Sequence, residues 1–281
     1  MKNLNRRIIS MLDKLQNITK NKLANGLWSI RRNEEVSVYQ VQEMDYFEDH
    51  ERKFKPDFDD SIKWGKISTG QRWGGYDKIF WFKAQINFPE HLKGGRFFLM
   101  PSLAKSSNLD VVPNYPESLL FINGAAVQGI DKYHKGIFLP QELLEKKTFT
   151  IHIRSWTRLR GKLDYTFFGL EFFVVNPVAQ KYYFLAKNVL DTIEELDKND
   201  FAYSRLLDIL NDSYKKIDFA YPRSQEYYDS ITQAFTSLSE GLKKLDFLKR
   251  EVPTIVVTGH SHLDMAWLWR VLHTREKAQR T

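Results

Sequence analysis

The sequence predicts a multi-domain chain whose largest part is an antiparallel β-sandwich of jelly-roll-like type, and three changes in hydrophobic period support this. Apolar residues alternate with polar ones from Lys78 to Phe88, recur at helical steps of three and four after Pro177, and run without a break from Thr254 to Thr258. We expect an amino-terminal helix (1–30), a β-sandwich domain (31–176), a helical connector (177–252) and the first strand, loop and helix of a parallel α/β domain (253–281).

The composition excludes several classes of protein. The 281 residues contain no cysteine, so a disulfide framework, a thiolate metal site and a cysteine nucleophile are excluded. The net charge of +7 comes from 42 basic and 35 acidic residues that are interspersed, so we expect no nucleic-acid partner. No apolar run approaches the ~20 residues of a membrane-spanning helix. The protein is therefore expected to be cytoplasmic, with no membrane partner.

The first half of the chain is expected to hold one helix, an irregular stretch and the first strand. Ile8, Leu15 and Ile18 belong to an apolar set at helical spacing. The stretch from Gly26 to about Gly75 is dense in charges and aromatics and is expected to be irregular. The strand from Lys78 to Phe88 is apolar at its even-numbered positions, so one of its faces should be buried.

The sandwich is completed by short strands separated by turn residues. The predicted strands are Arg96–Met100, Ser118–Ile122, Thr148–Ser155 and Tyr165–Val175. Asn123-Gly124 joins two apolar runs and predicts a tight hairpin. Short strands without helices between them favour an antiparallel sandwich. Its tryptophans are expected in the core or at hydrogen-bonded edges, although they could also line a carbohydrate groove; they are Trp64, Trp73, Trp81 and Trp156.

The connector is expected to contain three amphipathic helices. Their apolar stripes begin near Tyr182, Tyr203 and Tyr228. Pro222 interrupts the chain before the third helix, and Ser224 is its predicted N-cap. The stripes predict a packed helical core.

The last segment has the pattern of a parallel α/β unit. The β-branched run Thr254–Thr258 is typical of a strand buried on both faces, and Met265–Thr281 is rich in helix-forming residues. Such units bind ligands in the loops beyond the carboxyl ends of their strands. A site is therefore expected in the loop between these two elements.

His260, His262 and Asp264 alternate along this loop. Alternate side chains of an extended segment point the same way, so two imidazoles and a carboxylate could converge on a zinc ion. The spacing fits a structural role equally well, with Asp264 as the N-cap of the next helix and a histidine bonded to it. Spacing alone leaves both interpretations open.

A longer string around these residues is more specific. It reads Thr258-Gly259-His260-Ser261-His262-Leu263-Asp264-Met265-Ala266-Trp267-Leu268-Trp269, followed by His273-Thr274-Arg275-Glu276-Lys277 and Arg280-Thr281. This string closely resembles the start of the catalytic domain in zinc-dependent retaining α-mannosidases, glycoside hydrolase family 38. Upstream, Trp73-Gly74, Trp81-Phe82 and Leu120-Phe121-Ile122-Asn123-Gly124 resemble the sandwich-like amino-terminal domain of bacterial and vacuolar members.

The resemblance implies a parallel α/β barrel-type catalytic domain and roles for four residues. His262 and Asp264 would be two of four zinc ligands, His260 would support them without binding the metal, and Trp267 would stack on the mannose ring. Zinc would grip sugar hydroxyls while an aspartate nucleophile forms a glycosyl-enzyme. The implied partners are an α-mannoside oligosaccharide or mannosyl conjugate and the rest of the catalytic domain. A homo-oligomer is compatible with this.

The family's nucleophile, general acid and remaining two zinc ligands match nothing up to Thr281. No catalytic residue is therefore assigned in this chain, which we expect to be inactive on its own and without zinc, whereas the full-length enzyme would hold zinc. The alternative function is a non-catalytic carbohydrate-binding or assembly module of jelly-roll type.

Two other polar groups are interpreted as structural. Asp131 and His134 are expected in a turn at a hairpin end, with the histidine solvated. A small basic cluster is expected to be a solvated strand end and turn; it consists of Arg154, Arg158, Arg160 and Lys162.

Overall fold

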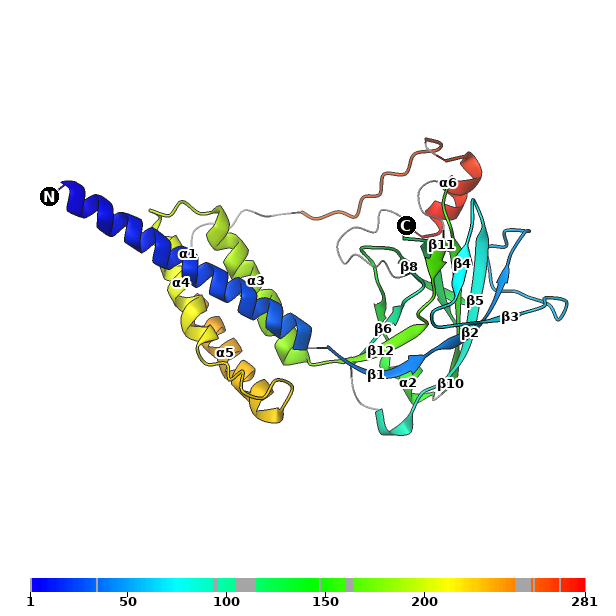
Figure 1. The fold of residues 1–281 in the computed structure, drawn as a ribbon, viewed down its shortest axis with the longest axis horizontal. Coiled ribbons are helices and arrows are strands. Elements are labelled where there is room, and N and C mark those ends of the chain that lie inside the picture. The colour runs from blue at the N-terminus through cyan, green and yellow to red at the C-terminus, as the bar shows by residue number, and fades with distance from the viewer. Residues whose placement is uncertain are drawn as a thin grey trace. The chain divides into compact units, whose positions relative to one another are not determined.

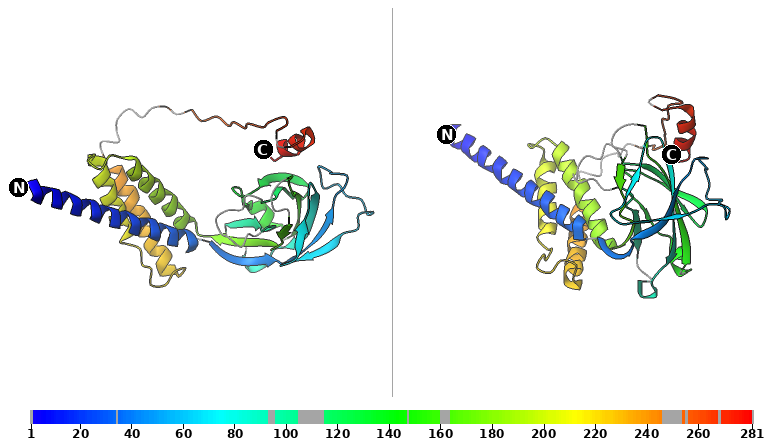
Figure 2. Two further views of the ribbon diagram at one scale, coloured as in Figure 1. Left: turned by 45° about the horizontal axis from the view of Figure 1, so that its top comes forward. Right: turned by 45° about the vertical axis from the view of Figure 1, so that its right-hand side comes forward.

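The computed structural model describes residues 2–33, 35–92, 96–104, 115–146, 148–159, 164–245, 254, 256–267 and 269–280. The chain divides into two compact units, and each is described by itself (Figures 1 and 2). The first unit consists of residues 1–36 and 175–256 and is helical. The second consists of residues 37–174 and 257–281 and is built on β-sheets.

The second unit is an antiparallel β-sandwich, as predicted. Its six-stranded sheet has the order β3-β2-β5-β10-β7-β8, its four-stranded sheet the order β1-β12-β6-β9, and β11 pairs with β4. The strands are β1 (Glu35–Val41), β2 (Glu43–Glu48), β3 (Gly65–Ser68), β4 (Arg72–Gly74), β5 (Ile79–Asn87), β6 (Phe97–Pro101), β7 (Glu117–Ile122), β8 (Ala125–Ile130), β9 (Ile137–Phe138), β10 (Thr148–Trp156), β11 (Asp164–Thr166) and β12 (Leu170–Val175). Two short helical segments, η1 (Glu90–Leu92) and α2 (Gln141–Glu145), lie between strands.

The main core of the sandwich contains the apolar positions of β5 that the alternation predicts. Phe80 and Phe82 pack in one cluster with Leu99 of β6 and residues of β12. The opposite face of β5 is also buried at one end, where Ile79 and Trp81 belong to a second apolar cluster. This second cluster is important for the site because residues of the last segment pack on it.

The predicted hairpin at Asn123-Gly124 is confirmed. β7 and β8 are antiparallel neighbours joined by these two residues. Their φ angles are +50° and +83°, and a two-residue turn with both angles positive follows the twist of the flanking strands.

The prediction of an irregular stretch from Gly26 to Gly75 is wrong in part. The first helix continues to Asn33, and four short strands, β1 to β4, lie within the stretch. In each of β2, β3 and β4 a single residue is buried, namely Met44, Ile67 or Trp73. One buried residue does not produce a visible period of two, so the alternation that predicts strands was absent.

The helical unit contains the three predicted connector helices and the amino-terminal helix. They are α1 (Lys2–Asn33), α3 (Pro177–Glu195), α4 (Phe201–Tyr214) and α5 (Gln225–Lys243). The predicted N-cap is confirmed, because the Ser224 hydroxyl accepts from the Tyr227 N–H at 3.2 Å. α1 joins the connector core through Leu23, Leu27 and Ile30. No helix of the described chain is long and apolar enough to cross a membrane.

The strand predicted for Thr254–Thr258 is not formed by its described residues. Val256 and Val257 are 79% and 88% exposed, while Ile255 lies outside the described residues. A strand of this composition needs a hydrogen-bonded neighbour on each side. No strand of the described chain pairs with it. The barrel-type domain therefore stays a prediction.

The helix predicted over Met265–Thr281 is present but shorter, as α6 (Val271–Ala278). The hydroxyl of Thr274 lies 3.1 Å from the carbonyl oxygen of Asp264 and also contacts that of Met265. If the helix began at Met265, backbone N–H groups would bond to these carbonyl groups. Here the Thr274 side chain bonds to them instead. α6, red in Figures 1 and 2, packs against the sandwich.

Candidate metal-binding loop

The structure brings two of the predicted metal ligands together. His262 Nε2 lies 3.0 Å from Asp264 Oδ1, and the two side chains are 80% and 39% exposed. His260 is exposed and is not part of this pair. Trp267 is 68% exposed and lies edge-on to Trp269, with ring centroids 5.7 Å apart. The loop therefore presents an imidazole, a carboxylate and an indole to solvent.

The structural alternative is wrong in its helix cap but confirmed in the contact between a histidine and the Asp264 carboxylate. The N-cap of α6 is Arg270, whose backbone N–H donates to His273 Nδ1 at 3.0 Å. The carboxylate of Asp264 instead contacts His262. Among the described residues each side chain has the other as its hydrogen-bond partner, and neither caps a helix.

The pair fits part of a zinc site in its donor atoms. Imidazole nitrogen and carboxylate oxygen are both zinc donors, and two ligands of a tetrahedral zinc lie about 3.4 Å apart when each is ~2.1 Å from the metal. The observed 3.0 Å is the length of a direct hydrogen bond, which zinc would replace by a bond to each side chain. The described residues contain no group of three or more His, Asp or Glu that could hold a metal ion. His262 and Asp264 thus supply only part of a coordination shell.

α6 is fixed on the sandwich by the buried carboxylate of Glu276. Its oxygens accept from Arg52 Nε at 2.9 Å, Arg52 Nη2 at 3.0 Å and Arg154 Nη2 at 3.0 Å. Burial raises the pKa of Glu276, but the hydrogen bonds and charges of Arg52 and Arg154 together hold it below its usual value.

The basic cluster predicted at a solvated strand end is buried at Arg154. Its side chain is 2% exposed because α6 covers it, so the prediction is wrong for this residue. Arg160 and Lys162 lie outside the described residues.

A second buried group on α6, His273, contacts the sandwich beside Glu276. Its ring stacks on Trp156, with centroids 4.7 Å apart and planes 21° apart, and its Nε2 lies 2.8 Å from Asp77 Oδ1. Trp156 donates to the same carboxylate at 2.9 Å, and Arg52 and Arg270 pair with it at 3.1 and 2.8 Å. Burial raises the pKa of Asp77, but these hydrogen bonds and charges hold it below its usual value.

The last turn of α6 is held by Glu117 of β7. Lys277 and Arg280 each approach its carboxylate to 2.6 Å, and Arg158 lies at 3.7 Å. Burial raises the pKa of Glu117, but these cations outweigh burial and lower it. The Lys277 ammonium also lies 4.6 Å from the centre of the Trp269 ring. Arg158, 36% exposed, therefore pairs with the same carboxylate that holds Lys277 and Arg280.

A pattern in the sequence could have revealed this face of α6. His273, Glu276, Lys277 and Arg280 follow one another at steps of three, one and three, so they share one face of a helix. That face is charged although it is packed. An apolar stripe therefore does not indicate this face, and only the helical spacing of its charged residues does.

The turn predicted at Asp131 and His134 is confirmed. The Asp131 carboxylate accepts from the backbone N–H groups of Tyr133 and His134 at 2.8 and 2.7 Å, and it lies 3.1 Å from His134 Nδ1. The side chains of His134 and Asp131 are 62% and 41% exposed. Unlike the Asp264 carboxylate, the Asp131 carboxylate accepts hydrogen bonds from two backbone N–H groups.

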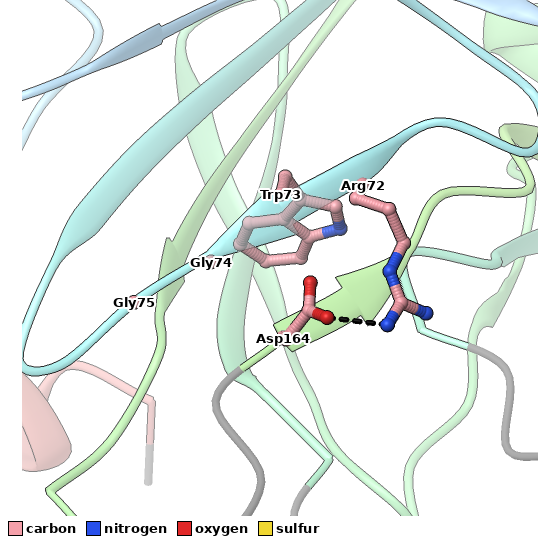
Figure 3. Close-up of a pocket in the computed structure, with 5 residues that line it drawn as sticks. All are labelled: Arg72, Trp73, Gly74, Gly75 and Asp164. Carbon is pink, nitrogen blue, oxygen red and sulfur yellow. Dashed lines mark hydrogen bonds and ion pairs between the residues drawn. The ribbon is translucent and has the colours of Figure 1, made fainter.

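The structural interpretation of the sandwich tryptophans is also confirmed. Trp73 is 5% exposed, and its indole N–H donates to the Leu103 carbonyl at 2.8 Å. Figure 3 shows Trp73 beside the ion pair of Arg72 and Asp164. These residues line a depression of about 430 Å³. Trp81 and Trp156 are buried as well, and Trp64 is half-buried. Trp73 is committed to the core and offers no free face for a sugar.

Comparison with known proteins adds limited information. No protein-family model and no curated protein matches the chain. Among solved structures it is similar to the CBM51-2 and INT domains from Clostridium perfringens ZmpB, at 8% identity and a TM-score of 0.21 over 74% of this chain and 43% of that chain. The same domains with GlcNAc match at 9% identity and a TM-score of 0.19. The chain spans less than half the length of these structures, and no function is assigned from them.

Proposed function

We propose that this chain is the amino-terminal part of a zinc-dependent retaining α-mannosidase and that it contributes His262 and Asp264 to the zinc site. The observation that carries the proposal is the exposed pair of side chains, an imidazole and a carboxylate that contact each other at 3.0 Å on one loop. The resemblance of the string around the pair to this enzyme family supports the same assignment.

Three residues of the loop have a role in this proposal. His262 binds through Nε2, and Asp264 binds through a carboxylate oxygen. When bound, zinc polarises the sugar hydroxyls and stabilises developing charge. The indole of Trp267, 68% exposed, packs against the C–H-rich face of the mannose ring.

Calorimetric titration with Zn²⁺ tests the metal assignment. With two ligands, the wild-type chain should bind added Zn²⁺ weakly, and His262→Ala and Asp264→Asn should abolish that binding. His134→Ala is the matched control, because it removes the histidine of an exposed His–Asp pair whose carboxylate is already occupied. Zinc binding that survives both loop substitutions would overturn the assignment.

Hydrolysis tests the reaction itself. In the complete enzyme, a chelator and His262→Ala should each abolish α-mannoside hydrolysis, and unchanged hydrolysis in both cases would refute the proposal. The alternative of a carbohydrate-binding module makes a different prediction. It would require methyl α-mannoside to bind this chain equally well with and without Zn²⁺.

A further inference from the structure

The hydroxyl of Thr274 connects α6 with the loop that carries the His262–Asp264 pair. It lies 3.1 Å from the carbonyl oxygen of Asp264 and contacts the carbonyl of Met265. It also accepts from the indole N–H of Trp269 at 3.1 Å. A hydroxyl has one proton, which Thr274 shares between these two carbonyl oxygens, while its own oxygen accepts from the indole.

α6 gives Thr274 a fixed position on the sandwich. Glu276, two residues further on, is held by Arg52 and Arg154, and the His273 ring stacks on Trp156. A contact from Thr274 therefore fixes the loop backbone to a rigid element. The side chains of His262 and Asp264 are 80% and 39% exposed, so they contribute little packing that would fix the loop.

From this geometry we infer that Thr274 is a positioning residue for the metal-binding loop. Its hydroxyl holds the backbone at Asp264 and Met265 so that the Asp264 carboxylate meets the His262 ring. Thr274 touches neither of those two side chains and acts through the backbone and Trp269. The metal part of this inference rests on the proposed function, whereas the positioning part stands on the contacts alone.

Two substitutions separate the hydroxyl from the rest of the side chain. Thr274→Val keeps the size and removes the hydroxyl, and Thr274→Ser keeps the hydroxyl. Without zinc, backbone amide relaxation should show larger motion of residues 264–267 in the valine variant, together with faster exchange of the Trp269 indole N–H. The α6 amides should remain as ordered as in the wild type, and serine should restore the loop.

Zinc affinity gives the second readout. A Zn²⁺ titration followed on isotope-labelled histidine side chains resolves His262 among the seven histidines of the chain. Loss of the hydrogen bond that the Thr274 hydroxyl donates to the loop backbone should weaken Zn²⁺ binding by about fivefold in Thr274→Val, and binding should stay near wild type in Thr274→Ser.

The outcomes distinguish this inference from the proposed function. If the wild type binds no Zn²⁺ at His262, the proposed function fails, and the relaxation data alone decide the positioning role. An unchanged loop in Thr274→Val would overturn the inference. A simultaneous loss of order in α6 would also overturn it, because Thr274 would then stabilise the helix instead of positioning the loop.

Discussion

Replacing Glu276 by alanine should release α6 from the sandwich. The carboxylate is fully buried and receives N–H groups from Arg52 and Arg154, and Arg154 is itself 2% exposed. Removing one partner of a buried ion pair costs about 3–5 kcal/mol, because the remaining charge stays buried without its partner. A helix of eight residues is not stable by itself in water, so α6 should unwind as it undocks.

Native-state hydrogen exchange of the Val271–Ala278 amides measures this effect. The opening equilibrium should increase by about a hundredfold or more in Glu276→Ala, and by less in Glu276→Gln, which keeps an acceptor oxygen. Lys66→Ala is the matched control, because it removes an exposed ion pair with Asp45 on the same sandwich. Equal α6 exchange in Glu276→Ala and in the wild type would refute the reasoning.

Three further predictions concern the same unit. The pKa values of Glu276 and Glu117 are lowered in the folded protein, so their stabilisation is present above their ordinary value of 4.5 and is lost as the pH falls through the lowered values. Exchange of the α6 amides should therefore accelerate in acid, and exchange independent of pH, after correction for the intrinsic rate, would contradict this. Trp267→Ala should leave the calorimetric melting temperature unchanged, whereas Trp269→Ala should lower it, because only Trp269 packs on the second apolar cluster. Gly124→Ala should cost about 1 kcal/mol in chemical denaturation, since a left-handed φ of +83° strains alanine even though no atom lies within 4 Å; no cost would contradict the turn.

Strands could be predicted from the sequence where one face is buried and the other solvated. The second half of β5 shows this, because the buried Ala84 and Ile86 alternate with exposed polar residues. β2 and β3 could not be predicted, because each buries only one residue fully, Met44 or Ile67. Apolar and polar residues alternate visibly only where several positions of one strand face are buried. A strand with a single buried position shows no such alternation.

The strand predicted for Thr254–Thr258 was not confirmed, for a different reason. Its composition indicates what the segment needs, namely strands on both sides, but not whether those strands are present. Among the described residues no strand pairs with it, and Val256 and Val257 are exposed.

The candidate site was predictable only in its local part. His262 and Asp264 are two positions apart, so their spacing indicated a pair. The anchor of α6 depends on Arg52 and Arg154, which lie far from Glu276 in the sequence, and the fold alone brings them together. Charged residues at helical spacing were the only local sign of this contact.

The central proposal is that His262 and Asp264, in the loop after residue 259, bind added Zn²⁺ weakly in this chain and hold zinc in the complete enzyme. Anomalous diffraction from a crystal of the protein grown with Zn²⁺ tests it most directly. The account predicts an anomalous peak within about 2.1 Å of both His262 Nε2 and an Asp264 carboxylate oxygen. Zinc bound at the Asp131–His134 turn, with none at the loop, would contradict it.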